Sequence, residues 1–130
     1  MEFQPINPKL NEVSGQIVDA AYQVHLNLGP GLLESVYQKC LLIELRERNL
    51  TVVTEVQLPL KYKGQNVDSN LRIDMLVEDE IIIELKAVEQ MLPVFESQLL
   101  TYLKLSNKRL GLLINFNVSL IKNGIKRVVL

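Results

Sequence analysis

The stretch Ile81-Ile82-Ile83-Glu84-Leu85-Lys86-Ala87-Val88 decides the fold that we expect, together with Leu71-Arg72-Ile73-Asp74-Met75-Leu76-Val77 just before it. Both are rich in β-branched and apolar residues, as in strands buried on at least one face. Since side chains alternate along a strand, Glu84 and Lys86 share one face and the residues flanking them take the other. An isolated buried charge costs several kcal/mol unless it is paired or bound to a metal. Asp74, Glu84 and Lys86 therefore mark a candidate functional site.

Length and composition are those of one small globular domain, which we expect to extend over residues 1–130. The chain is 48% hydrophobic and 22% charged, enough to form a hydrophobic core. No apolar run is long enough to span a bilayer, so we expect no membrane association. The single cysteine, Cys40, excludes an intrachain disulfide and a four-cysteine zinc or iron–sulfur site. Residues 1–5 lack the basic and apolar segments of a secretory signal, and we expect a reducing, cytoplasmic location.

The net charge of −1 hides an asymmetry along the chain. Residues 1–96 contain all 15 acidic residues and 8 of the 14 basic ones. Residues 97–130 contain no acid and six bases: Lys104, Lys108, Arg109, Lys122, Lys126 and Arg127. This basic third could bind a polyanion, or it could be a solvated face balanced by acids nearby in the fold. The sequence leaves both alternatives open.

Hydrophobic periodicity predicts elements in the order α-α-β-β-β-α-β, with a short terminal strand. The breaker Gly29-Pro30-Gly31 separates the first two helices. Turns are expected near Gly64 and at Asn123-Gly124. The short acidic turn Glu78-Asp79-Glu80 favours an antiparallel hairpin that brings the two charged stretches together. The expected elements are helices over residues 11–28, 32–48 and 91–105, and strands over residues 52–60, 71–77, 81–88, 109–117 and 125–130.

Asp74 and Glu84 are predicted to approach each other across this hairpin. Two neighbouring carboxylates repel, so one binds a proton or a cation lies between them. Mg²⁺ prefers oxygen ligands, which makes the pair a minimal magnesium site. Lys86, on the same face as Glu84, could stabilise developing negative charge. The alternative is an ion pair of Lys86 with Glu84 or Asp74 at the edge of the sheet.

Two further motifs extend this candidate site. Glu34 and Tyr37 in Gly31-Leu32-Leu33-Glu34-Ser35-Val36-Tyr37 share a helix face. The simpler role for Glu34 is a favourable interaction with the dipole of the first helical turn. Gln98 and Tyr102, four residues apart on the third helix, also share a face. Their simpler role is a polar helix edge with Tyr102 half buried.

These motifs resemble a known nuclease superfamily. The order Asp74…Glu84-x-Lys86 is similar to the core of the PD-(D/E)XK nuclease superfamily, with Ile73 in place of the proline that names it. The stretch Gly31-x-x-Glu34-x-x-Tyr37 resembles the GxxExxY family of that superfamily, and Gln98-x-x-x-Tyr102 resembles a motif of RecB-type nucleases. The resemblance extends from about Val13 to Leu130. It implies an α/β, restriction-endonuclease-like αβββαβ core with a mixed central sheet flanked by helices.

The resemblance also implies roles for individual residues. Glu34, Asp74 and Glu84 would bind Mg²⁺ or Mn²⁺, with the backbone carbonyl of Leu85 as a further ligand. Lys86 would be catalytic. Gln98 and Tyr102 would orient this lysine or contact the nucleic-acid backbone. Some RecB-type relatives have an iron–sulfur cluster, which a chain with one cysteine cannot form.

The leading hypothesis is a metal-dependent nuclease that hydrolyses phosphodiester bonds, with DNA as the expected substrate. A rival is a nucleic-acid- or partner-binding module with this fold and little or no turnover. A third possibility is a homo-oligomeric structural protein whose charges form ion pairs. The chain lacks the GxxxxGK[ST] phosphate loop, which argues against hydrolysis of nucleoside triphosphates.

Two other polar residues have open roles. His25 lies near the end of the first helix, where the dipole favours a histidine, and it could instead approach the site. Arg72 shares a strand face with Asp74, so it could pair with that carboxylate or bind a phosphate.

Overall fold

The computed structural model describes residues 4–130. Residues 1–3 lie outside the described part. They belong to the expected domain and to residues 1–5, where no secretory signal is expected. Within the described part, no helix has both the length and the apolar character needed to cross a membrane.

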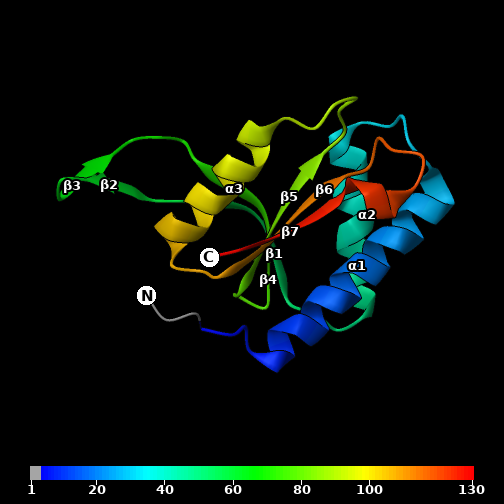
Figure 1. Cartoon of the computed structure of the whole chain (residues 1–130), viewed down its shortest axis with the longest axis horizontal. Coiled ribbons are helices and arrows are strands. Elements are labelled where there is room, and N and C mark those ends of the chain that lie inside the picture. The colour runs from blue at the N-terminus through cyan, green and yellow to red at the C-terminus, as the bar shows by residue number, and fades with distance from the viewer. Residues whose placement is uncertain (1–3) are drawn as a thin grey trace.

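The centre of the molecule is a five-stranded sheet in the order β1-β4-β5-β6-β7 (Figure 1). Neighbouring strands are antiparallel except β5 and β6, which are parallel, so the sheet is mixed as expected. The parallel pair needs a crossover, and α3 (Pro93–Ser106) provides it. The strands are β1 (Val52–Gln57), β4 (Arg72–Val77), β5 (Ile81–Lys86), β6 (Leu110–Asn115) and β7 (Ile125–Val129).

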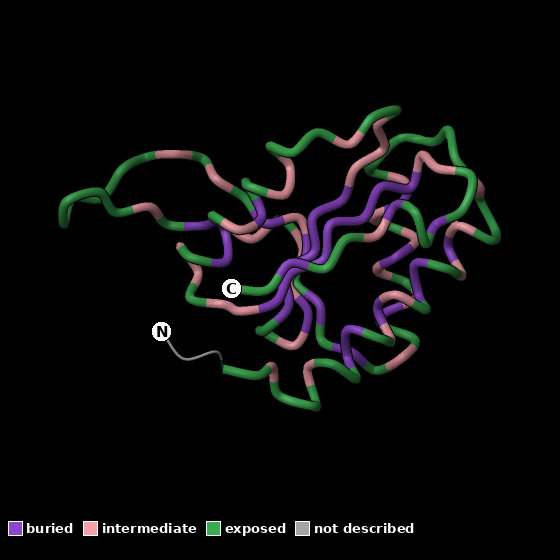
Figure 2. Tube along the Cα trace, in the orientation of Figure 1, coloured by how far each residue is buried: buried purple, intermediate pink, exposed green. Residues whose placement is uncertain are grey.

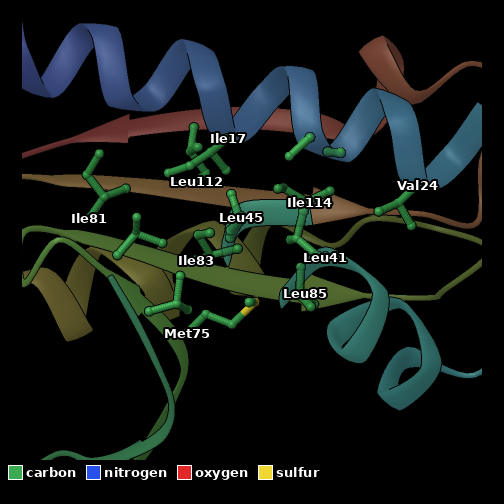
Figure 3. Packing of buried hydrophobic residues seen from close by; sticks show 14 of the residues in the cluster. Ile17, Val24, Leu41, Leu45, Met75, Ile81, Ile83, Leu85, Leu112 and Ile114 are labelled. Carbon is green, nitrogen blue, oxygen red and sulfur yellow. The ribbon is translucent and has the colours of Figure 1, made fainter. Parts of the chain in front are cut away.

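Helices α1 (Pro8–Leu28) and α2 (Glu34–Glu47) cover one face of the sheet. Figure 3 shows their apolar side chains packed on those of β4, β5 and β6. The alternation predicted for β5 is confirmed, because Ile83 and Leu85 are fully buried in this core. Tyr37 and Phe116 stack at its end, with ring centroids 4.6 Å apart. This large dry face holds the sheet rigidly, which fixes the positions of the side chains on the opposite face.

Helix α3 covers the other face with a smaller core that includes Leu99, Tyr102 and Leu103. It packs closely on β6 at Gly111, where a Cβ would lie 2.8 Å from Leu99 Cδ1. A larger residue at this position would require the Leu99 side chain to shift.

A second, two-stranded sheet lies outside the main one. It consists of β2 (Leu60–Tyr62) and β3 (Gln65–Val67), which pair with each other and with no other strand of residues 4–130. In Figure 1 this hairpin projects from the body of the molecule, and Figure 2 shows little burial along it. The sequence predicted the turn near Gly64 but extended the preceding strand to residue 60, whereas β1 ends at Gln57.

The other expected elements are confirmed, with shifted ends. Helix α1 begins at Pro8 and not at residue 11, because Asn7 Oδ1 accepts a hydrogen bond from the backbone N–H of Lys9 at 2.9 Å. Helix α2 begins at Glu34, after the breaker, and not at residue 32. The expected turn at Asn123-Gly124 is part of a 3₁₀ helix, η1 (Ile121–Gly124). A Cβ at Gly124 would lie 2.1 Å from Asn115 O, so glycine is required there.

Candidate active site

The site forms where the ladder between β4 and β5 stops. Three pairs join these strands, from Val77–Ile81 to Met75–Ile83. In the same register Asp74 lies opposite Glu84, but no backbone pair forms there. Instead, Asp74 Oδ2 accepts a hydrogen bond from the backbone N–H of Leu85 at 2.8 Å, in place of a backbone carbonyl of β4. The predicted hairpin is therefore confirmed, and Asp74 and Glu84 come together at its open end.

Glu84 is the most unusual side chain of this site. It is 5% exposed, and its Oε1 has no hydrogen-bond partner among the described residues. Burial, together with the neighbouring Asp74 carboxyl group, raises the pKa of Glu84 to about 10, although the positive charge of Lys86 opposes this shift. A buried carboxylate beside another carboxylate favours a bound proton or cation. Glu84 therefore has the properties expected of a protonated carboxyl group or of a metal ligand.

Lys86 continues the same strand face but forms no ion pair with a carboxylate in the described part of the chain. Its Nζ lies 4.5 Å from the ring centroid of Phe95, in the first turn of α3. A cation over an aromatic face is attracted by the ring quadrupole. The expected alternative, a Lys86 ion pair with Glu84 or Asp74, is not observed. Phe95 holds the ammonium group beside the carboxylates without neutralising them.

Glu34 reaches the site from the helix that covers the opposite face. It is the first residue of α2 and its side chain is exposed. Desolvation raises its pKa, as does the charge of Asp74, whereas Lys86 lowers it. The charges of Asp74 and Lys86 thus both act on the Glu34 carboxyl group. The role of Glu34 as a metal ligand stays a prediction.

Tyr37 explains why Glu34 lies there. Its buried hydroxyl donates to Gly29 O at 2.6 Å and accepts from the N–H of Leu32 at 3.1 Å. The intervening Gly31 has φ 99°, which glycine adopts without steric cost. Tyr37 therefore clamps the loop that precedes α2 and sets the start of the helix at Glu34. In the stretch Gly31-x-x-Glu34-x-x-Tyr37, the tyrosine positions the loop and the glutamate faces the site.

Two residues near the site were missed by the sequence analysis. Glu55 in β1 lies opposite Asp74 in the register, and its charge also raises the pKa of Glu34. Its φ of 54° is rare for a residue other than glycine, and it interrupts the ladder of β1 with β4. Gln38 Nε2 donates to Glu55 Oε1 at 3.0 Å and lies 3.5 Å from Asp74 O. These two residues could not be predicted, because their approach to Asp74 depends on the register between β1 and β4, which no local sequence pattern gives.

Helix α3 brings one of its two expected residues to the site. Tyr102 is buried, and burial, Glu84 and Asp74 all raise the pKa of its hydroxyl. Gln98, one turn earlier, is exposed, and it has no side-chain hydrogen bond within residues 4–130. Tyr102 therefore borders the carboxylate pair, whereas Gln98 faces solvent at the rim.

Asn115 supports the segment that follows Lys86. Its buried amide donates to Val88 O at 2.9 Å and accepts from Val88 N–H at 3.1 Å. In the parallel register it lies beside Lys86. The sequence did not single out Asn115, since an asparagine at the end of an apolar strand is a common pattern.

The donor chemistry of the site fits a hard divalent cation. Asp74 and Glu84 provide carboxylate oxygens, and Glu84 Oε1 lacks a partner. The N–H and C=O of one strand residue point to the same edge of the strand. The Leu85 N–H donates to Asp74 Oδ2, so the Leu85 carbonyl points to the side of Asp74 as well. Mg²⁺ favours such all-oxygen sets. Within residues 4–130, no group of three His, Cys, Asp or Glu side chains is close enough to hold a metal ion, so Glu34 is not yet at ligand distance.

The remaining candidates have structural partners. His25 Nε2 lies 2.7 Å from Val118 O, at the end of α1, consistent with the structural alternative. Arg72 pairs with Glu55 at 3.3 Å and not with Asp74.

In the basic C-terminal third, residues 97–130, Lys108 pairs with Asp79 at 3.6 Å and Lys126 pairs with Glu96 at 3.0 Å. Arg109 donates to the backbone carbonyls of Gln4, Pro5 and Leu130, and Arg127 to Asn11 Oδ1. Most of the basic side chains of this third therefore have interaction partners within the fold.

Comparison with known proteins places this arrangement in a family. The family model of the PD-(D/E)XK nuclease superfamily matches residues 11–128. No curated protein and no solved structure matches the chain. The small α/β domain, with a mixed five-stranded sheet flanked by helices, is consistent with a restriction-endonuclease-like fold. Since the match extends over most of the sequence, the chain belongs to the PD-(D/E)XK nuclease superfamily.

Proposed function

We propose that the chain is a single-domain, Mg²⁺- or Mn²⁺-dependent nuclease of the GxxExxY type that hydrolyses phosphodiester bonds in DNA. The observation that supports this most is Glu84, a buried carboxylate with an unpartnered oxygen, opposite Asp74 and followed by Lys86. A carboxylate in this position costs stability unless it binds a proton or a cation, and a divalent cation can replace the proton. Nucleases of the superfamily generally use divalent metals.

Asp74, Glu84 and the Leu85 carbonyl would hold the metal ion, and a small movement of the start of α2 would bring Glu34 to it. The bound ion would neutralise phosphate charge and lower the pKa of a water molecule. Asp74 has a second role, because its bond to the Leu85 N–H keeps β4 and β5 in register at the open end. The site residues therefore position one another before substrate binds.

Lys86 would stabilise the negative charge that develops on a phosphate oxygen in the transition state. Its ammonium group lies over Phe95 and forms no ion pair with the described carboxylates, which leaves its N–H donors available to a substrate. Tyr102, at the inner border of the site, and Gln98, at the rim, would orient Lys86 or contact the nucleic-acid backbone.

Cleavage of a labelled duplex in Mn²⁺ tests the proposal. We expect EDTA to abolish cleavage, and Asp74→Asn and Lys86→Ala each to reduce kcat by about 10²–10³-fold. Lys108→Ala, at the other end of the sheet, should leave kcat unchanged. Full activity in Asp74→Asn and in Lys86→Ala would exclude these residues as the catalytic site.

One observation favours the alternative of a binding module with little turnover. Within residues 4–130, three metal-ligating side chains do not converge. Such a module would bind oligonucleotides with a steep salt dependence and leave them intact in Mg²⁺, Mn²⁺ and EDTA alike. Cleavage that depends on Asp74 would exclude it.

A further inference from the structure

The β2–β3 hairpin is folded outside the hydrophobic core. Among the described residues, its two strands pair with each other alone, and every residue from Lys61 to Val67 is exposed. A two-stranded hairpin by itself is marginally stable in water. The side chains of this hairpin contribute little to the core, so its role lies at the surface that it presents.

The tip of the hairpin is basic and aromatic. It has the sequence Lys61-Tyr62-Lys63-Gly64, and the Tyr62 side chain is 64% exposed. Lys63 Nζ lies 5.6 Å from the centroid of the Tyr62 ring. Neither lysine forms an ion pair with any carboxylate within residues 4–130. The opposite strand presents the uncharged amides of Gln65 and Asn66. Two cations without ion pairs in the described residues, one of them beside an exposed aromatic ring, are suited to a polyanion.

The base of the hairpin is fixed to the end of the sheet that contains the candidate active site. It leaves the sheet after Gln57 and returns at Arg72, two residues before Asp74. At its base Leu58 is 5% exposed, and its N–H donates to Leu71 O at 2.8 Å. A ligand held by the tip would therefore lie on the same side of the molecule as Asp74 and Glu84.

We propose that the β2–β3 hairpin is a DNA-binding arm, in which Lys61 and Lys63 contact phosphates of a duplex and Tyr62 packs on its sugars. A two-stranded ribbon has a width that the major groove of B-DNA admits. This inference rests on the proposed function, because it assigns the substrate contacts of that same site. The arm provides affinity by charge and position, and the carboxylates provide the chemistry.

Binding of a fluorescent 30-bp duplex, measured by anisotropy in EDTA from 50 to 200 mM NaCl, tests the arm. Each lysine that contacts a phosphate contributes about 0.9 to the slope of log K against log salt. The double variant Lys61→Ala/Lys63→Ala should therefore reduce the slope by about 2. The matched control, Lys9→Ala/Lys108→Ala, removes the same charge at the opposite end of the sheet and should leave the slope unchanged. Tyr62→Ala should weaken binding at every salt concentration, and Tyr62→Phe should not.

Cleavage kinetics in Mn²⁺ separate a failure of the arm from a failure of the proposed function. The arm predicts that Lys61→Ala/Lys63→Ala raises KM with kcat unchanged. If the wild-type protein binds and cleaves the duplex and this variant has the same slope and KM, the arm is excluded and the nuclease remains. If the wild-type protein neither binds nor cleaves the duplex, both are excluded. Circular dichroism should show that the variants of the hairpin keep the fold, because the side chains of Lys61, Tyr62 and Lys63 are exposed.

Discussion

The two faces of strand β5 have opposite properties although their residues alternate in one sequence. Ile81, Ile83 and Leu85 are fully buried under α1 and α2, in a dry core (Figure 3). Glu84 and Lys86 lie on the other face, where Lys86 is only partly buried and the buried Glu84 has a carboxyl oxygen without a partner in the described residues. The first face provides stability, and the second stores an electrostatic cost that a ligand can relieve. The contrast shows that one strand of six residues contributes to the hydrophobic core with one face and to the candidate site with the other.

The largest change in stability is expected on the dry face. Ile83→Ala would remove a fully buried side chain and leave a cavity, which costs about 2–5 kcal/mol. Urea unfolding followed by circular dichroism measures this loss. The matched change on the other face, Lys86→Ala, should alter the free energy of unfolding by less than about 1 kcal/mol, because Lys86 is partly exposed and its contact with Phe95 is the main packing interaction lost within residues 4–130. Equal losses from the two variants would contradict the division between the faces.

Tyr37→Phe tests the connection between the two faces, since Tyr37 packs in the dry core and holds the loop before Glu34. The change keeps the stack on Phe116 but leaves Gly29 O and Leu32 N–H without their partner. We expect a loss of about 1–3 kcal/mol in the free energy of unfolding. Nuclease activity should fall as well, because the start of α2 is released. Unchanged hydrogen exchange at the Leu32 amide would rule out the clamp.

Glu84→Gln tests the electrostatic cost through its pH dependence. The pKa of Glu84 is raised from 4.5 to about 10 in the folded protein, so between these values the folded state binds more protons than the unfolded state. This contribution to stability is fully present below about pH 4.5 and is lost as the pH rises, with a slope of at most about 1.4 kcal/mol per pH unit. In EDTA, unfolding at pH 5–8 should show a steeper decline for the wild type than for Glu84→Gln. Parallel curves would show that Glu84 is ionised when buried.

The smallest expected effect concerns the contact of Phe95 with Lys86. Phe95→Leu keeps an apolar side chain but removes the aromatic face, which is worth about 0.5–1 kcal/mol for partly exposed residues such as these. NMR should show loss of the upfield ring-current shift at the Lys86 Cε protons, and cleavage should slow by a corresponding factor. Phe95→Tyr is the control and should retain both. An unshifted Lys86 in the wild type would exclude this contact in solution, whether or not the chain is a nuclease.

Much of the fold was predictable because periodicity is a local property. The β4–β5 hairpin follows from two strands and the short turn Glu78-Asp79-Glu80, and the structure confirms it. The separation of Glu84 and Lys86 from Ile83 and Leu85 also follows from alternation along a strand. The separate β2–β3 hairpin was missed, because residues 52–60 have continuous strand character and only the pairing shows where β1 ends.

The approach of Asp74 to Glu84 was predicted from the sequence, whereas the neighbours of these residues were not, and the roles of the site residues stay predictions. Asp74 and Glu84 come together as expected, and Glu34 and Tyr102 interact with them electrostatically. Glu55 and Gln38 were absent from the prediction, since their approach to Asp74 depends on the register of β1 with β4. The interaction of Lys86 with Phe95 was likewise invisible, because the two lie on different elements and no spacing rule relates them.

The sequence by itself determined the order of the elements, the charged end of one strand and the identity of the carboxylates, because each depends on local spacing and residue type. Only the tertiary structure decided which of these charges are neutralised. It paired Arg72 with Glu55, used Arg109 to bind the N-terminal and C-terminal backbone, and left Glu84 Oε1 without a described partner. The physical reason is that burial and electrostatic interaction depend on distances in space, which strand register and helix packing set.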